Sequence, residues 1–307
     1  MKNKLPTVTI GIPAYNEEAN IGNLLADIAN QETRTFKLKK IVVACDSPSD
    51  HTLEIVRRFA KRNKKIKIIN GRKRLGQTTR LGQLFSLVET DYLICFDADV
   101  ALTDPKVIEK LILPLKAKKR NGLVGANLQP AKAENLFEHA MNTMFEIWYK
   151  VRLQHQSGNN IFSHLGAAFA IKSELAHTVN FPSFIVANQH FLYISVLRKG
   201  WRFAFAREAR VLFRSPSCFA DYHVQATRPF TEKAQIFAYF GDSVKKMFVT
   251  PSSYKAKAIL LTFIQSPLLT SLGLTLFAWI RVYTHLTISK KQTVLWDTPF
   301  STKRAVA

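Results

Sequence analysis

The sequence has few acidic residues for its length. Its 307 residues include 22 Asp and Glu against 44 Lys and Arg, so the formal net charge is +22. Such an excess favours anionic partners: nucleotide phosphates, acidic lipid head groups or nucleic acid. Much of it lies in four clusters, at residues 37–40, 57–67, 72–74 and 116–120. These clusters have no recognition motif and no regular interleaving of aromatic residues, which argues against nucleic acid.

The chain also has only three cysteines, Cys45, Cys95 and Cys218, and they are far apart. Zinc sites and disulfide frameworks need characteristic spacings of cysteine, so neither is expected. Reduced thiols in a cytoplasmic setting fit this usage. The sequence likewise has no low-complexity tract and no obvious internal repeat. Its length suits one large domain, or one domain with an appendage.

Apolar segments alternate with amphipathic ones along the first hundred residues. Strands are predicted at residues 8–12, 40–44, 66–69 and 92–96, and helices at residues 21–28, 52–62 and 77–88. This alternation indicates an α/β fold with a doubly wound, mostly parallel sheet. The predicted elements of the second half are strands at residues 122–128, 164–170 and 211–214 and helices at residues 135–154 and 188–200.

The apolar run at residues 92–96 leads directly into the carboxylates of Asp97 and Asp99. Ligands of open α/β sheets bind beyond the carboxyl ends of the strands. Residues two apart on an extended chain point to the same side, and two hard oxygens there suit a divalent cation that also binds phosphate. Polar loops at residues 13–18 and 45–52 end two other strands, so we expect all three loops to form one nucleotide site.

Two phosphate-binding fingerprints are missing from this predicted site. Neither G-x-G-x-x-G nor G-x-x-x-x-G-K-[ST] follows the first strand. A nucleotide would therefore be bound by other means. These are an aromatic side chain for the base, a carboxylate for the base edge and a metal ion for the diphosphate.

Four segments resemble the motifs of a known family. They are I-P-A-Y-N-E-E at residues 12–18, D-S-P-S-D-H-T at 46–52, R-L-G-Q-T-T-R-L-G at 74–82 and D-A-D at 97–99. In this order and spacing the sequence resembles the family-2 glycosyltransferases of GT-A fold, over roughly the first two-thirds of the chain. It departs from the family pattern at Cys45, where Asp is usual, and at Arg80, where Asn is more common.

The resemblance implies a nucleotide-sugar donor, with Mg²⁺ or Mn²⁺ as cofactor. It implies that Asp46 meets the base and that Asp97 and Asp99 hold the metal ion against the diphosphate. The residues that it assigns to the nucleotide sugar are Pro13, Ala14, Tyr15, Glu17, Asp46, Arg74, Gly76 and Asp97.

The acceptor side has an unusual composition. Gly166 lies in a stretch of small residues, which would let a sugar approach the backbone. Where the family has an acidic pair that includes the general base, this chain has Asn188, Gln189 and His190. Neither amide accepts a proton at neutral pH. Three alternatives stay open: His190 is the catalytic base, the acceptor is already an anion such as a lipid phosphate, or the protein is a catalytically weakened relative.

Residues 221–229 resemble the Q-x-x-R-W element of membrane polysaccharide synthases, with Pro229 in place of Trp. On this resemblance Gln225 and Arg228 lie beside the acceptor or the donor diphosphate, which an Arg can bind in a bidentate manner. The missing Trp argues against a processive polymerase.

The C-terminal residues have a different character. We expect a glycosyltransferase domain at residues 1–230 and membrane-associated helices at residues 231–307. Residues 231–249 have an amphipathic pattern, which is typical of an interfacial helix or of core packing. Residues 258–280 have no charged side chain and are numerous enough to span a bilayer. A re-entrant or interfacial hairpin broken at Pro267 is the alternative.

Together these features predict a metal-dependent glycosyltransferase at the cytoplasmic face of the cell membrane. The expected donor is a nucleotide sugar, the expected acceptor is a lipid phosphate or a cell-envelope glycan, and no nucleic acid is expected. Inversion at the anomeric carbon is implied by the resemblance. A non-catalytic or weakened nucleotide-sugar-binding relative is the alternative.

Overall fold

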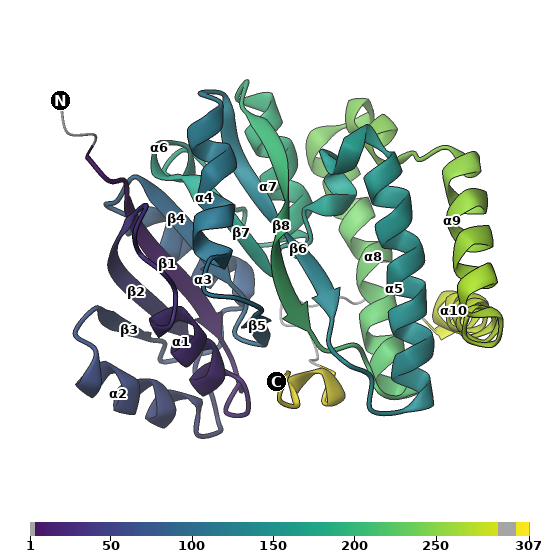
Figure 1. Cartoon of the computed structure of the whole chain (residues 1–307), viewed down its shortest axis with the longest axis horizontal. Helices are drawn as coiled ribbons and strands as arrows, with labels where there is room; N and C mark the ends of the chain where they lie inside the picture. The colour runs from purple at the N-terminus through teal and green to yellow at the C-terminus, as the bar shows by residue number, and fades with distance from the viewer. Residues whose placement is uncertain (1–3, 288–298, 307) are drawn as a thin grey trace.

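The structure is a computed structural model that describes residues 4–287 and 299–306. In this part of the chain eight strands form one sheet, in the order β3-β2-β1-β4-β7-β6-β8-β5. Helices flank the sheet, and four of them, α5, α8, α9 and α10, gather at one end (Figure 1).

The N-terminal half follows the predicted alternation. Its elements are β1 (Thr7–Ala14), α1 (Ile21–Ala29), β2 (Lys37–Cys45), α2 (Thr52–Arg62), β3 (Ile66–Asn70), α3 (Gln77–Ser86) and β4 (Tyr92–Phe96). The β1 strand pairs in parallel with both β2 and β4, and β2 pairs in parallel with β3. The carboxyl ends of these strands therefore share one edge of the sheet, as predicted.

The second half makes the sheet mixed rather than simply doubly wound. Its elements are β5 (Val100–Leu102), α4 (Val107–Ala117), β6 (Asn121–Pro130), α5 (Leu136–Gln154), β7 (Ala168–Lys172), α6 (Ser173–Ala176), α7 (Asn188–Arg198) and β8 (Arg202–Phe213). The β7 strand runs antiparallel to both β4 and β6, and β5 runs antiparallel to β8. The β5 strand and α4 were not predicted, and β8 is much longer than the predicted strand at residues 211–214.

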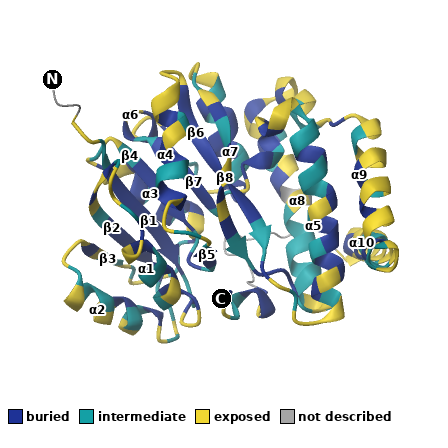
Figure 2. Cartoon of the chain, viewed as in Figure 1, coloured by how far each residue is buried: buried dark blue, intermediate teal, exposed yellow. Residues whose placement is uncertain are grey.

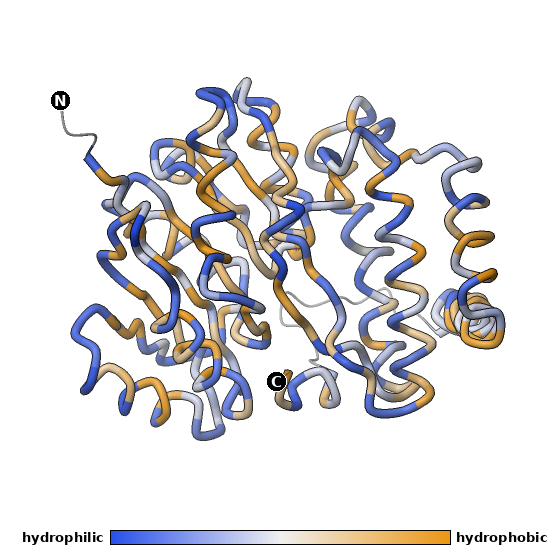
Figure 3. Tube along the Cα trace, in the orientation of Figure 1, coloured by the Kyte–Doolittle hydropathy of each residue, from blue (hydrophilic) through white to orange (hydrophobic). Residues whose placement is uncertain are grey.

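The β4 strand shows why the core needs helices on both faces. Ile94 and Phe96 lie in a cluster with side chains of α1 and α4, whereas Leu93 and Cys95 lie in a second cluster with side chains of α3 and α7. All four are buried, because successive residues of a strand point to opposite faces. The central strands are accordingly the dark blue part of Figure 2 and largely hydrophobic in Figure 3.

The C-terminal helices are α8 (Phe219–Phe240), α9 (Ser252–Gln265) and α10 (Pro267–Thr287), with a 3-10 helix, Asp242–Phe248, after α8. The uncharged run at residues 258–280 is therefore two helices, which separate at Ser266. Among the described residues, no helix has both the length and the apolar character needed to cross a bilayer. The expected single span over residues 258–280 is therefore not formed as one helix, and the break falls at Pro267, where the alternative placed it.

The amphipathic pattern at residues 231–249 comes from core packing. Ile236, Phe240 and Val244 are buried in the same cluster as Phe191 of α7. Of the two readings of this segment, core packing is thus the one that the structure adopts. By contrast, α9 and α10 pack on α5 around a separate small cluster, outside the sheet.

The last described segment, residues 299–306, returns to the other side of the molecule. It contains a short 3-10 helix, Ser301–Lys303, and lies near the sheet rather than beside α10 (Figure 1). The side chain of Asn20, just before α1, hydrogen-bonds to the backbone of both Lys303 and Val306. The C-terminal segment therefore meets the loop between β1 and α1 at the carboxyl edge of the parallel strands.

Candidate functional site

A cavity of about 390 Å³ lies at the carboxyl ends of β1, β2 and β4. Eleven of the predicted site residues line it: Pro13, Ala14, Tyr15, Glu17, Asp46, Arg74, Gly76, Asp97, Asp99, Gln225 and Arg228. They come from five separate stretches of sequence. The strand order accounts for the N-terminal ones, and α8 supplies Gln225 and Arg228 from the opposite side.

Tyr15 and Arg74 lie face to face in this cavity. The guanidinium carbon of Arg74 is 4.0 Å from the centroid of the Tyr15 ring, a cation–π contact. Both groups have flat surfaces that can stack on a nucleotide base. Both side chains line the cavity together with Asp46, and their flat faces suit a base.

The carboxylate of Asp46 accepts three hydrogen bonds from the protein. One carboxylate oxygen accepts hydrogen bonds from the Leu75 backbone (2.9 Å) and from Nε of Arg80 (2.7 Å), and the other accepts from the Gly76 backbone (2.8 Å). Both charged side chains are buried. Asp46 thus holds the loop before α3, a structural task that the sequence did not suggest.

Arg80, the residue that departs from the family pattern, explains the neighbouring Gly71. A Cβ atom at Gly71 would overlap the Arg80 guanidinium. This guanidinium also donates to the Lys73 carbonyl (3.0 Å) and to Gln83 (2.9 Å). The unusual Arg is therefore accommodated by a glycine, paired with Asp46 and held by three hydrogen bonds, as a buried charge requires.

Asp97 and Asp99 reach the same cavity through a turn. The β4 strand ends at Phe96, and residues 97–99 leave the extended conformation, so the predicted two-residue alternation is not what places them. The Asp97 backbone N–H donates to the Ala167 carbonyl (2.7 Å), and its side chain accepts from Gln77 (2.6 Å). The turn, rather than the strand, directs both carboxylates to the site.

The carboxyl groups of Asp97 and Asp99 are buried close together, and their pKa values are raised. Burial, with the charge of Asp99 as the next cause, raises the pKa of Asp97 to about 8. The same two causes raise the pKa of Glu17 to about 8. Burial also raises the pKa of Asp99 itself. At neutral pH the group would therefore retain protons unless a cation joined it.

A divalent cation suits this donor set. The Oε2 atom of Glu17 is buried without a hydrogen-bond donor, and Asp97 and Asp99 supply hard carboxylate oxygens on one cavity wall. Across residues 4–287 and 299–306, no three His, Cys, Asp or Glu side chains form a complete metal site. The two aspartates would thus be a partial ligand set, of the kind that phosphate and water oxygens complete.

Gly166, Asn188, Gln189 and His190 do not line the cavity, although Leu165 and Ala167 do. Gly166 has a φ of +83°, and a Cβ there would lie 3.1 Å from the Cβ of Gln189. The small residue thus lets this loop approach the start of α7. The predicted acceptor-side residues lie together, directly behind the cavity wall.

One carboxylate next to these residues was missed by the sequence prediction. Glu232 of α8 accepts a hydrogen bond from Gln189 (3.2 Å) and lies 3.6 Å from Nδ1 of His190. Burial raises the pKa of Glu232 and lowers the pKa of His190 to about 4, so this histidine is neutral at pH 7. Glu232 follows Arg228 by one helical turn, a spacing that could have indicated it.

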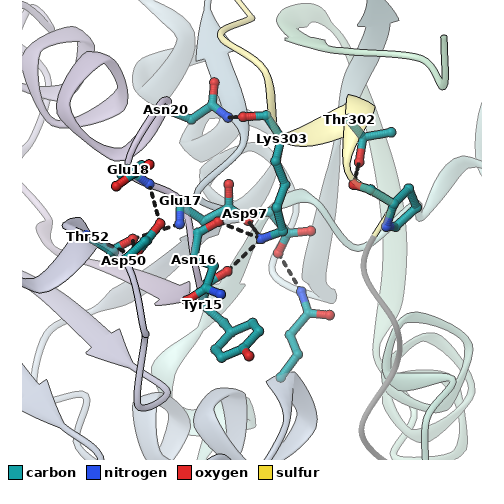
Figure 4. Close-up of polar contacts among 12 residues, drawn as sticks. Tyr15, Asn16, Glu17, Glu18, Asn20, Asp50, Thr52, Asp97, Thr302 and Lys303 are labelled. Atoms are coloured by element: carbon teal, nitrogen blue, oxygen red, sulfur yellow. Dashed lines mark hydrogen bonds and ion pairs between the residues drawn. The ribbon is translucent and has the colours of Figure 1, made fainter. Parts of the chain in front are cut away.

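Three residues near the C-terminus also line the cavity: Pro299, Thr302 and Lys303. The ammonium nitrogen of Lys303 lies 2.5 Å from Oε1 of Glu17 and 2.5 Å from the Tyr15 carbonyl oxygen. Figure 4 shows this side chain reaching between Glu17 and Asp97. No local pattern in the sequence links positions separated by more than 280 residues.

The family model described as Glycosyl transferase family 2 matches residues 9–179, more than half of the chain. The chain belongs to this family. The match contains β1 to β7 and therefore every predicted nucleotide-sugar residue, so this family-2 domain has its cavity at the position that the resemblance implied.

Curated relatives match the same region. Glycosyltransferase AglD of Haloferax volcanii is 26% identical over 166 residues, which are 51% of this chain and 26% of that protein. A beta-monoglucosyldiacylglycerol synthase of Trichormus variabilis is 27% identical over 155 residues, 49% of this chain and 32% of that protein. The alignments thus cover only about a quarter to a third of these longer relatives.

Among solved structures, a mannosyltransferase of Pyrobaculum calidifontis, determined with GDP-Man and Mn²⁺, superposes with a TM-score of 0.61 at 19% identity. The superposition covers 94% of this chain and 77% of that one. At this identity the likeness establishes the GT-A fold of the family-2 domain, including its mixed sheet.

The buried pair of Asp46 and Arg80 should contribute strongly to stability. We expect Asp46→Ala to lower the free energy of unfolding by about 3–5 kcal/mol, because it leaves the Arg80 charge buried without its carboxylate. Adding Arg80→Met should recover part of this loss. Urea denaturation measures both values. Equal midpoints for Asp46→Ala and the wild type would show that the pair is not structural.

The crowded carboxylates predict how stability depends on pH when a chelator is present. A carboxyl whose folded-state pKa is raised binds more protons in the folded state, so the free energy of unfolding should fall as pH rises from about 5 to about 9. Asp97→Asn should flatten this slope. Thermal melting across the range tests it, and a slope that is the same in both proteins would contradict the assignment.

Proposed function

We propose that this protein transfers a sugar from a nucleoside-diphosphate sugar to a lipid-linked or cell-envelope acceptor, with Mg²⁺ or Mn²⁺ as cofactor. One observation carries the proposal: a single cavity contains a stacking pair, Tyr15 and Arg74, and the carboxylates of Asp97 and Asp99. The pair suits a base, and the carboxylates suit a metal-bound diphosphate. A nucleotide sugar has both groups, a base and a diphosphate.

The metal ion would neutralise the diphosphate as it leaves, which is typically a large electrostatic contribution. Arg228 also lines the cavity and suits the same diphosphate through bidentate hydrogen bonds. The mannosyltransferase of the same fold binds GDP-Man with Mn²⁺, which supports this combination of donor and metal.

The acceptor that fits best is a lipid phosphate. Asn188 and Gln189 stand where a carboxylate base is expected, and Gln189 donates its amide to Glu232. A phosphate oxygen is already ionised at pH 7 and needs no such base. Relatives named as a monoglucosyldiacylglycerol synthase and a 4,4'-diaponeurosporenoate glycosyltransferase of Staphylococcus haemolyticus have lipids in their names. These names support a lipid-linked acceptor.

We further propose that the consecutive helices α9 and α10 rest on the cytoplasmic face of a membrane. Large apolar side chains point outward along it: Leu260, Ile264, Leu268, Trp279, Val282 and Leu286. In Figure 2 the outer side of α9 is largely exposed. Lys255, Lys257 and Arg281 lie on the same two helices and would favour anionic lipid head groups.

The alternative is a nucleotide-sugar-binding relative with little or no catalysis. The amides at Asn188 and Gln189 favour it, since they remove the expected base. Asp97, Asp99 and the cavity argue against it, because they keep the parts that act on the donor. Donor binding without turnover on any acceptor would favour this alternative.

The function predicts that Asp99→Ala reduces turnover about 100-fold or more, since it removes a group that stabilises the leaving diphosphate. Purified protein would be incubated with UDP- and GDP-sugars, Mn²⁺ and membrane lipid extract, and release of nucleoside diphosphate would be measured. A chelator should have the same effect as the substitution. Release that is unaffected by both would contradict the metal site.

The same assay with defined acceptors separates the two acceptor classes. With a polyprenyl phosphate, His190→Ala should change turnover only modestly. With a hydroxyl acceptor, loss of a catalytic base should cost about 100- to 10,000-fold. A large loss in His190→Ala with the phosphate acceptor would contradict the preferred acceptor.

Membrane binding should depend on the exposed apolar side chains of α9 and α10. We expect Ile264→Glu with Leu268→Glu to reduce binding to vesicles of phosphatidylcholine and phosphatidylglycerol by about tenfold or more, because two exposed apolar side chains leave the lipid. The control is Leu113→Glu, at a leucine of α4 that is also exposed but lies on another helix. Sedimentation with vesicles measures both. Equal binding of the two variants would show that α9 and α10 do not anchor the protein to the membrane.

A further inference from the structure

Residues 299–306 are fixed to the body of the protein by many contacts. The anchoring hydrogen bonds join Phe300 and Ser301 to Asp221, Ser301 to Ser217, Ala305 to Arg214, and Lys303 and Val306 to Asn20. Val306 is buried against Ala101 and Ala131. This C-terminal segment is therefore packed in a defined place, and Pro299, Thr302 and Lys303 form part of the cavity wall.

Lys303 uses its whole donor capacity on one turn of the chain. An ammonium has three N–H donors. Its nitrogen lies 2.5 Å from the Tyr15 carbonyl oxygen, 2.8 Å from the Asn16 carbonyl oxygen and 2.5 Å from Oε1 of Glu17. Asn16 has a positive φ of 52°, a conformation that non-glycine residues rarely adopt. The ammonium therefore joins three acceptors of a turn that is strained on its own.

The position of Lys303 also leaves the two aspartates open. Its three hydrogen bonds go to the Tyr15–Asn16–Glu17 turn and not to Asp97 or Asp99, although its charge lowers the pKa of both aspartates and of Glu17. The side chain thus offsets the negative charge of the cavity without using the oxygens that suit a metal ion. Figure 4 shows the ammonium between the turn and Asp97.

We propose that Lys303 is a positioning residue of the nucleotide-sugar site, and that the C-terminal segment is part of this site. Lys303 holds the turn that carries Tyr15, so that the ring faces Arg74 and a base can stack there. It also supplies a fixed positive charge beside the carboxylates and the diphosphate. This inference rests on the proposed function and adds a positioning residue outside residues 9–179, the region that matches the family.

An opposite role would be a tethered competitor that occupies the place of the metal ion. Such a lysine would hydrogen-bond to Asp97 or Asp99, and its removal would strengthen binding of Mn²⁺ and nucleotide. The two roles therefore differ in the sign of the effect, which a binding measurement determines directly.

The test is calorimetric titration of the full chain with Mn²⁺ and GDP or UDP. We expect Lys303→Ala to weaken nucleotide binding about 10- to 100-fold, as for loss of charged hydrogen bonds. The matched control is Lys110→Ala, which removes a lysine 2.7 Å from Asp104, outside the cavity. Equal or tighter nucleotide binding by Lys303→Ala would overturn the inference. If the wild type binds neither nucleotide, the proposed function fails as well.

Restoring the ammonium chemically separates charge from general damage to the fold. Lys303→Cys would be prepared with Cys218→Ser, since Cys218 is the exposed cysteine, and Cys45 and Cys95 are buried. Alkylation with 2-bromoethylamine then creates an ammonium of nearly the length of lysine. We expect it to restore most of the nucleotide affinity. Affinity that stays low after complete alkylation, in protein that melts like the wild type, would contradict the role of the ammonium.

Discussion

Burial of the carboxylates of Glu17, Asp97 and Asp99 in one site is the constraint on which the candidate site depends. The strand order brings the three carboxylates to one edge of the sheet, where burial makes their charges costly and raises the pKa of each. Cations must therefore lie close by. Arg228 approaches from α8 and Lys303 from the C-terminal segment, and a divalent metal ion with a diphosphate would complete the balance.

The same constraint explains why a segment near the C-terminus packs against the turn that follows β1. The turn after β1 supplies Tyr15 and Glu17, and residues 299–306 return to hold the same turn through Lys303. In between, α9 and α10 pack on α5 at the far end of the molecule. The donor site and the lipid-facing helices α9 and α10 would thus be separate surfaces of the molecule.

Much of the parallel half and of its cavity could be predicted from the sequence, because these features depend on local patterns. The apolar run before Asp97 and the polar loops after β1 and β2 each indicate a strand end. Less local features were missed. The antiparallel β7, the turn at residues 97–99, and the approach of Glu232 and Lys303 depend on packing between distant segments. The absence of charge over residues 258–280 predicted one long helix, but these residues form two helices, because Pro267 begins a new one.

The most direct test of the central claim is a crystal structure with Mn²⁺ and GDP or UDP, in which anomalous scattering locates the metal ion. The account predicts one manganese peak between Asp97 and Asp99, bound to the diphosphate, with the base against Tyr15 and Lys303 still bonded to Glu17. A nucleotide bound elsewhere would contradict it. So would a manganese ion that touches neither aspartate.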